Sequence, residues 1–131
     1  MHMKKIGYGA ESFIYVGWIF CVMAIFKIVT DKPTAGTIAG IGFVLLPLFF
    51  LYIEMKVRDK RNYLHAVVLL VFLLSSALPI ILLRILNQGV PFDSIELLGI
   101  TGPQLHKISN YTYMLMLFSS AGRFLYLRFK K

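Results

Sequence analysis

The residues of this 131-residue chain that could carry chemistry are ionisable or polar side chains set within long apolar segments. Glu11 lies near the start of the first such segment, with Tyr15 and Trp18 on the same helical face at i+4 and i+7. In a membrane, an ionisable group is costly and is therefore a candidate functional residue. We expect this stripe either to line a polar cavity or to combine a favourable first-turn acid with ordinary interfacial aromatic anchors.

Arg84 is the second candidate, because it lies close to the end of the third apolar segment. Its long side chain can reach the membrane interface while its stem stays in the apolar region. It can also pair with Asp93 or Glu96 in the segment that follows. The remaining interpretation is a site for an anion or a lipid headgroup.

The third candidate is a polar stripe along the last apolar segment, with members at i, i+3, i+7, i+10 and i+14. Its members are Ser109, Thr112, Met116, Ser119 and Arg123. Polar side chains of membrane helices face the protein interior, so the stripe predicts helix packing, or alternatively a hydrophilic path or ligand groove. We expect Arg123 at the same depth as Glu11 and Glu54, where an ion pair can form.

No pattern in the chain indicates a catalytic or metal centre, and no cofactor is expected. His65 and His106 begin two apolar segments that run in opposite directions, so they are expected at opposite membrane faces, which argues against haem ligation by both. For the same reason we expect no Ser/His/acid set at one depth. The single cysteine, Cys21, excludes an intrachain disulfide and is expected to pack as a small residue.

The composition requires elements that can turn apolar side chains outward. Hydrophobic residues make up 58% of the chain and charged residues 15%, whereas a soluble domain is about half apolar and about a quarter charged. Residues 62–83 contain no Asp, Glu, Lys or Arg, which is long enough to cross a bilayer. The segments lack the alternation of a barrel, so the sequence predicts an all-α integral membrane four-helix bundle.

We predict a single four-span domain over residues 1–131, with spans at about 12–29, 33–55, 63–86 and 103–127. Asp31 and Pro33 can start the second span, and Thr101 with Gln104 fits a capping box that starts the fourth. Asp93-Ser-Ile-Glu96 has the spacing of a capped helix start, which predicts a short amphipathic helix in the outer loop before the fourth span.

The lysine and arginine distribution predicts the orientation. Ten lie in the two termini and the second loop, and four lie on the other side. The first group comprises Lys4, Lys5, Lys56, Arg58, Lys60, Arg61, Arg123, Arg128, Lys130 and Lys131. The second comprises Lys27, Lys32, Arg84 and Lys107. The positive-inside rule therefore places both termini in the cytoplasm of a multi-pass protein of the inner (plasma) membrane.

Small residues predict where the helices approach each other. Their faces include Gly17, Gly36, Gly40, Ser119 and Gly122. Such faces pack helices within one bundle, or, for Gly36 and Gly40, join protomers of an oligomer. Pro47 and Pro79 are expected to kink their helices, as static bends or as hinges.

The basic loop predicts contacts at the cytoplasmic surface. Its Lys56, Arg58, Lys60 and Arg61 either serve orientation alone or contact anionic headgroups or an acidic partner. The net charge of +8 does not indicate nucleic-acid binding, because the cations gather at helix ends and not on one soluble face.

Three hypotheses for function follow. The first is a small membrane protein without catalytic machinery that forms a homo-oligomer or serves as a subunit of a larger membrane complex. The alternative is a minimal ion or small-molecule transporter or channel, built by oligomerisation around Glu11, Arg84 and the polar face of the fourth span. An intramembrane enzyme acting on lipid is a third, less supported hypothesis.

Overall fold

The computed structural model describes residues 7–58, 62–87, 90 and 94–130. Over these residues the secondary structure is helical apart from the connecting turns and one small hairpin, which confirms the all-α prediction. The elements in chain order are α1 (Tyr8–Ile28), α2 (Lys32–Tyr52) with its π-helical continuation η2 (Ile53–Val57), α3 (Tyr63–Phe72), the π-helical segment η3 (Leu73–Ala77), α4 (Leu78–Leu86), β1 (Glu96–Leu97), β2 (Ile100–Thr101) and α5 (Gly102–Phe129).

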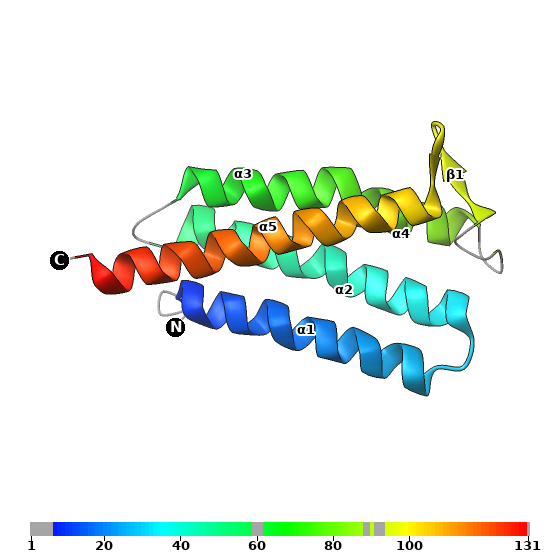
Figure 1. Ribbon diagram of the computed structural model, residues 1–131, viewed down its shortest axis with the longest axis horizontal. Helices are drawn as coiled ribbons and strands as arrows, with labels where there is room; N and C mark the ends of the chain where they lie inside the picture. Colours follow the sequence, from blue (N-terminus) through cyan, green and yellow to red (C-terminus); the bar gives the residue numbers. More distant parts are fainter. Residues whose placement is uncertain (1–6, 59–61, 88–89, 91–93, 131) are drawn as a thin grey trace.

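The helices form an antiparallel bundle (Figure 1). The start of α1, the end of η2, the start of α3 and the end of α5 lie at one end, and the hairpin lies at the other. The helix α5 packs against both α1 and α3, while α2 packs against α1, α3 and α4. Side chains from all parts of the sequence therefore meet inside the bundle.

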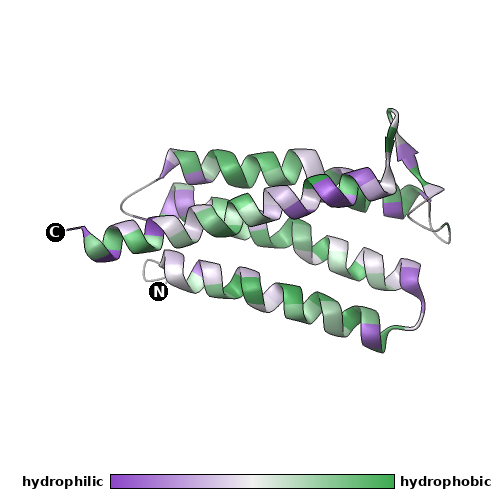
Figure 2. Ribbon diagram, viewed as in Figure 1, coloured by the Kyte–Doolittle hydropathy of each residue, from purple (hydrophilic) through white to green (hydrophobic). Residues whose placement is uncertain are grey.

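Three described helices are long and apolar enough to cross a membrane: Tyr8–Ile28, Lys32–Val57 and Tyr63–Leu86. They coincide with the first three predicted spans to within four residues at each end. The last helix, α5, has 28 residues and is therefore about 42 Å long at 1.5 Å per residue, but it is more hydrophilic, especially in its first half (Figure 2).

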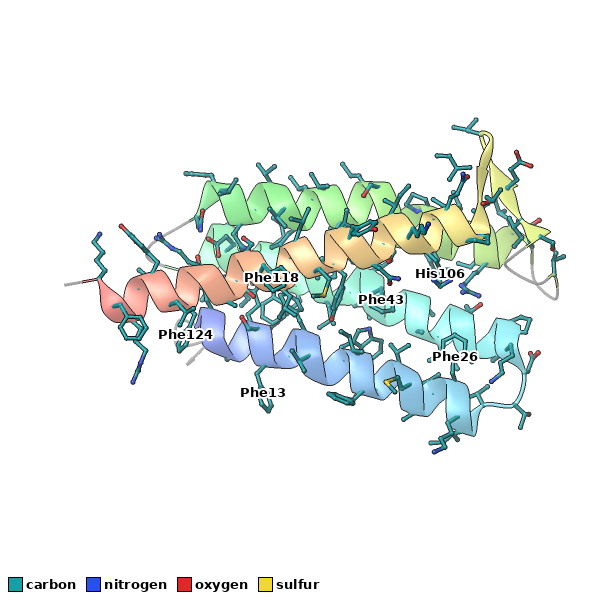
Figure 3. The ribbon with its side chains drawn as sticks, in the orientation of Figure 1. Phe13, Phe26, Phe43, His106, Phe118 and Phe124 are labelled. Atoms are coloured by element: carbon teal, nitrogen blue, oxygen red, sulfur yellow. The ribbon has the colours of Figure 1, made fainter. Side chains whose placement is uncertain are left out.

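The distribution of polarity is the reverse of that in a soluble protein. Phe13 is 80% exposed and points away from the bundle (Figure 3), whereas Glu11, Glu54 and His65 are completely buried. Water-soluble domains seldom bury charged groups completely, and they expose large apolar side chains singly. The apolar outer surface is suited to lipid.

Aromatic side chains fill the middle of the bundle. Tyr15, Phe50, Phe72, Tyr113 and Met116 are each at most 5% exposed and form its main core. The aromatic rings in this core meet edge to face, with centroids 5.2 Å apart for Tyr15 and Phe50 and 5.5 Å apart for Phe72 and Tyr113. Such pairs fix helix rotation more narrowly than aliphatic contacts do.

Local sequence explains where the helices begin. The Asn62 side chain accepts hydrogen bonds from the backbone N–H groups of Leu64 and His65, at 3.1 and 3.3 Å, and so caps α3. At α5, Thr101 accepts from the Gln104 N–H at 3.3 Å, and the Gln104 side chain accepts from the Thr101 N–H at 2.9 Å. The predicted capping box is confirmed.

The third predicted span is one continuous helix with a π-helical turn, η3, directly before Pro79. A proline removes one N–H donor and its ring collides with the carbonyl four residues earlier, here that of Ser75. A π-turn relieves this crowding by spacing the backbone more widely.

Two predictions about local structure are wrong. Over its described residues, the outer segment forms a small β-hairpin and not an amphipathic helix, with Glu96 opposite Thr101. Both residues of its turn, Leu98 and Gly99, have a positive φ, of 52° and 83°. A Gly at the second turn position favours this turn over helix continuation. Cys21 is exposed on the bundle surface and is not a packing residue.

Candidate functional site

A cluster of ionisable side chains is buried at the end of the bundle where α1 begins. It comprises Tyr8 and Glu11 of α1, Glu54 of η2, Arg58 directly after η2, and His65 of α3. We call this set the ionic cluster. Each of the five residues is at most 7% exposed, so the cluster is closed off from the surroundings.

Glu11 lies at its centre. Its Oε1 accepts a hydrogen bond from Arg58 Nη2 at 2.8 Å, and its Oε2 lies 2.5 Å from His65 Nε2. The Tyr15 hydroxyl, one turn further along α1, donates to the same Oε2. Residues of two helices, α1 and α3, and one loop residue thus meet at one carboxylate.

Glu54 forms the second anionic centre. The Tyr8 hydroxyl donates to its Oε1 at 2.6 Å, and the backbone N–H of Asn62 donates to the same oxygen. Arg58 Nη1 donates to its Oε2 at 2.5 Å. The guanidinium also lies over the Tyr8 ring, 3.8 Å from its centroid. Arg58 thus contacts both carboxylates and one aromatic ring.

Arg58 bridges the two carboxylates with different nitrogens of one planar group, a geometry that lysine cannot supply. Burial by itself lowers the pKa of Arg58, but its hydrogen bond to Glu54 and the negative charge of Glu11 outweigh burial, and the pKa of the guanidinium is raised. By formal charge, the two carboxylates and one guanidinium leave the cluster with one net negative charge.

His65 extends the cluster to α5, because its Nδ1 lies 2.8 Å from Ser119 Oγ. Ser119, His65 and Glu11 are therefore connected in series, which is the order of a Ser/His/acid triad. The expectation that no such set shares one depth is wrong. The starts of α1 and α3 and the last third of α5 lie at the same end of the bundle, which brings the three side chains to one level.

This arrangement suits proton transfer better than nucleophilic attack. A hydroxyl, an imidazole and a carboxylate can pass a proton along their hydrogen bonds. A serine nucleophile also needs donors for an oxyanion, which backbone N–H groups often supply. Ser119 lies in the interior of α5, where the backbone N–H groups are already bonded within the helix.

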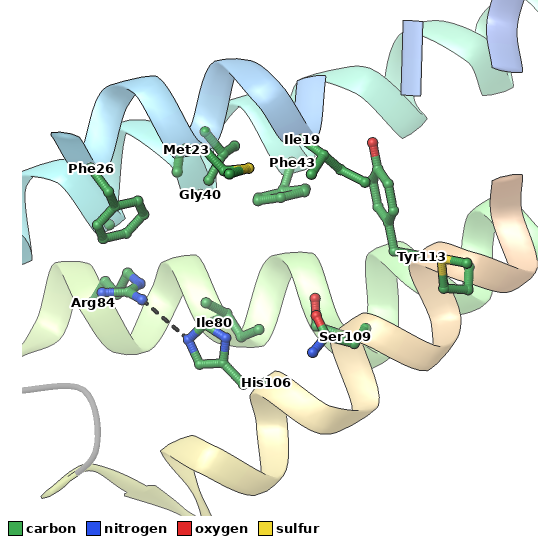
Figure 4. A pocket seen from close by; sticks show the side chains of 15 residues that line it. Ile19, Met23, Phe26, Gly40, Phe43, Ile80, Arg84, His106, Ser109 and Tyr113 are labelled. Atoms are coloured by element: carbon green, nitrogen blue, oxygen red, sulfur yellow. Dashed lines mark hydrogen bonds between the residues drawn. The ribbon is translucent and has the colours of Figure 1, made fainter. Parts of the chain in front are cut away.

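A cavity of about 360 Å³ occupies the other half of the bundle (Figure 4). Side chains of α1, α2, α4 and α5 line it. Tyr113 joins the cavity to the ionic cluster, since it lines the cavity and its hydroxyl donates to the Tyr15 carbonyl at 2.6 Å. The Tyr15 hydroxyl in turn donates to Glu11, so Tyr113 and Tyr15 connect the cavity wall with the region of the buried carboxylate.

The structure separates the predicted Glu11, Tyr15 and Trp18 stripe. The first two belong to the buried network, but the Trp18 ring packs over Gly42 and meets Phe43 edge to face at 5.9 Å. Its indole Nε1 is buried and has no hydrogen-bond partner among the residues that the structure describes. Trp18 is thus a packing neighbour of the cavity wall.

The polar stripe of α5 faces other helices for most of its length. Ser109 lines the cavity, Thr112 Oγ1 lies 3.0 Å from Ser76 Oγ of η3, and Ser119 contacts His65. We expected Arg123 to form an ion pair with Glu11 or Glu54, but Arg58 forms the ion pairs with both carboxylates. The Arg123 guanidinium lies over the Tyr126 ring, 5.2 Å from its centroid.

The predicted small-residue faces divide into two groups. A side chain at Gly36 would overlap the Arg84 guanidinium, and one at Gly40 would come within 2.8 Å of Ile81 Cδ1, so both face α4 of the same protomer. Nothing described lies within 4 Å of a Cβ added at Gly17 or Gly122.

The basic loop also divides. Lys56 is exposed, whereas Arg58, expected at the headgroups, is 7% exposed and belongs to the ionic cluster. Lys60 and Arg61 lie outside the described residues, as does Asp93, one expected partner of Arg84. The other expected partner, Glu96, is exposed on the hairpin.

The sequence interpretation missed the grouping of Glu54, His65 and Tyr8. Glu54 carried a usable signal, because it is an acid within an apolar span. Among the residues that the structure describes, no three His, Cys, Asp or Glu side chains are arranged to hold a metal ion. No protein-family model, curated protein or solved structure matches this chain.

Proposed function

We propose that the chain is a four-span protein of the inner membrane, with both termini cytoplasmic, that moves protons through the interior of a single protomer. The ionic cluster faces the cytoplasmic side in this proposal, and the cavity faces the outside. Glu11 and His65 carry the proton between them, and Tyr15 and Tyr113 separate the cluster from the cavity.

The observation that carries the proposal is the chain of hydrogen bonds from the half-buried Ser119 through the completely buried His65 and Glu11, inside a bundle with an apolar surface. An ion pair that served stability alone would be complete with Glu11, Glu54 and Arg58. The imidazole adds a group with two ring nitrogens, so that it can donate a hydrogen bond at one and accept at the other.

The proposal requires α5 to be a fourth span, and its surface supports this. Its outward residues are large and apolar or aromatic, with Tyr111 71%, Leu115 56% and Phe118 64% exposed. Its polar residues Thr112 and Ser119 make contacts inside the bundle. The low overall hydropathy of α5 thus comes partly from residues that lipid would not meet.

Proton flux in vesicles tests the proposal. The protein is reconstituted in vesicles that contain a pH-sensitive dye, and valinomycin with a potassium gradient imposes the membrane potential. We expect faster acidification or alkalinisation than in protein-free vesicles. Glu11→Gln should bring the rate close to that of protein-free vesicles, because it removes the central acceptor. The matched control is Glu96→Gln, the same change at an exposed hairpin residue.

Two outcomes would overturn proton movement: wild-type vesicles that behave like empty ones, or Glu11→Gln vesicles with undiminished flux. Size-exclusion profiles of both variants in detergent establish that they fold. The mass of the detergent complex separates this proposal from the homo-oligomer and subunit hypotheses, because a path inside one protomer needs no second copy.

A second candidate function is acyl transfer to or from a lipid, favoured by the Ser119, His65 and Glu11 series. In that case a fluorophosphonate probe should label the wild-type protein at Ser119 and should fail to label Ser119→Ala. A wild-type protein that resists labelling in membranes and in detergent rules this candidate out.

A further inference from the structure

The cavity has a chemistry of its own that the movement of protons does not require. It lies on the opposite side of Tyr113 from the ionic cluster, and its volume of about 360 Å³ is within the range of about 300–1,000 Å³ of small-molecule sites. It is large enough for one short chain or ring system and too small for a two-chain lipid.

One end of the cavity is polar. Arg84 of α4 and His106 of α5 meet there, with Arg84 Nη2 3.5 Å from His106 Nε2 (Figure 4). The guanidinium of Arg84 is positively charged and only donates hydrogen bonds. Ser109 and Asn110 add a hydroxyl and an amide along the α5 wall.

The Arg84 guanidinium takes this place because α2 has a glycine opposite it. A Cβ at Gly36 would overlap both the Nη1 and the Cζ atoms of Arg84. The guanidinium thus rests against the backbone of α2, at the cavity wall. The absence of a side chain at Gly36 makes room for the charged group and does not only allow the two helices to approach closely.

The rest of the cavity is apolar. Phe26 lies beside Arg84, and Met23, Ile80 and Phe43 line the path towards Tyr113 (Figure 4). A ligand that satisfies both parts has an anionic head and a slender apolar body. The polar end belongs to the side of the bundle where the hairpin lies, so such a ligand would orient with its body towards the bundle centre.

We propose that this cavity binds a single-chain anionic amphiphile, with its carboxylate or phosphate head at Arg84 and its apolar chain between Phe26 and Tyr113. Charge-assisted hydrogen bonds from the guanidinium hold the head, and burial of the chain adds affinity. The ligand class follows from the cavity itself and stands whether or not the ionic cluster moves protons.

Trp18 provides the measurement. It is the only tryptophan in the chain, and its ring packs on Phe43, which lines the cavity. The wild-type protein in phosphatidylcholine nanodiscs is titrated with octanoate, octyl phosphate, octanol, octylammonium and inorganic phosphate while Trp18 emission is recorded. We expect saturable changes with octanoate and octyl phosphate, and about tenfold weaker binding or none with the other three probes.

Two substitutions test the assignment of the head. Arg84→Gln removes the charge, and Gly36→Ala leaves the charge but displaces the guanidinium; each should weaken octanoate binding about tenfold and leave octanol binding unchanged. Gly17→Ala is the matched control, because nothing described lies within 4 Å of its added Cβ. Its octanoate affinity should equal that of the wild type.

The proposal is overturned if octanoate binds no more tightly than octanol and octylammonium, or if Arg84→Gln and Gly36→Ala bind octanoate like the wild type. Saturable binding of inorganic phosphate as tight as that of octyl phosphate would also contradict it, since the apolar chain would then contribute nothing. Binding without proton flux in vesicles would refute the proposed function and leave the ligand site standing.

Discussion

At the scale of single residues, Arg58 holds the ionic cluster together. It is the only cation among the cluster's residues apart from a protonated His65, and it faces Glu11 and Glu54 at 2.8 and 2.5 Å. Without it, two carboxylates would be buried next to each other in a site of low dielectric constant. Removing one partner from a buried ion pair is more costly than replacing the whole pair, because the other charge stays buried without compensation.

We therefore predict that Arg58→Gln lowers the free energy of unfolding by about 3–5 kcal/mol, measured by circular dichroism during denaturation in mixed detergent. Lys56→Gln is the control, because it removes an equal charge two residues away at an exposed position. Equal stability of the two variants would mean that the Arg58 pairs contribute no more than a surface charge.

Ser119 is the second single residue on which the proposed proton path depends. Its hydroxyl is a partner of His65 Nδ1 at 2.8 Å, and the neighbouring Ser120 is a partner of Ser12 at 2.7 Å. We predict that Ser119→Ala slows proton flux in vesicles several-fold, while Ser120→Ala, which removes a hydroxyl outside the series, leaves it near the wild-type rate. Equal rates in the two variants would exclude Ser119 from the path.

At the scale of elements, the hairpin shows how local chemistry decides between helix and strand. Gly99 adopts a positive φ at no cost, but Leu98 also has a positive φ of 52°, and its side chain is 95% exposed. A non-glycine residue in this conformation costs about 1–2 kcal/mol, and asparagine tolerates it better than most. The turn is therefore strained at Leu98, without a packing contact that would compensate.

Leu98→Asn should relieve this strain. We predict that it slows hydrogen exchange of the Gly102 amide, which donates to the Ile95 carbonyl at 2.9 Å across the base of the hairpin, about fivefold. Leu98→Ala removes the same exposed side chain and retains the strain, so it should exchange like the wild type. Faster exchange in Leu98→Asn would mean that Leu98 anchors the hairpin.

The two π-helical segments also act at this scale. The segment η3 precedes Pro79, and η2 ends at Val57, directly before Arg58, which pairs with Glu54 of η2 inside the bundle. Each π-turn adds a residue and so rotates the following helix by about 100° relative to an uninterrupted α-helix. His65 and Arg84 lie on either side of η3, and its presence determines which faces they occupy.

At the scale of the whole molecule, the two candidate sites lie at opposite ends of one bundle. The proposed topology places the Lys56 end in the cytoplasm and the hairpin outside. Since Cys21 is the only cysteine, a Cys21→Ser background allows single reporters to be introduced. We predict that Glu96→Cys in intact cells reacts with a membrane-impermeant maleimide, and that Lys56→Cys reacts only after permeabilisation. The reverse pattern would invert the topology and place the cavity on the cytoplasmic side.

The sequence by itself determined the class of the protein and most of its helix boundaries. A membrane helix satisfies its backbone within one segment, so the length of an apolar run, a capping residue such as Asn62 and the Thr101 capping box locate it without reference to the rest of the chain. The sequence also indicated the polar face of α5, and it indicated Glu11 and Arg84 as candidate site residues because they are ionisable groups in apolar segments.

Only the tertiary structure decided which of these groups meet. Whether Glu11, His65 and Ser119 touch depends on the relative depth and rotation of three helices, which aromatic packing and the π-turns set together. No single segment carries that information, because the residues in each contact are 54 positions apart in the sequence. Arg58 illustrates this, since a loop cation that sequence assigns to the membrane surface turns inward once two buried carboxylates are brought within its reach.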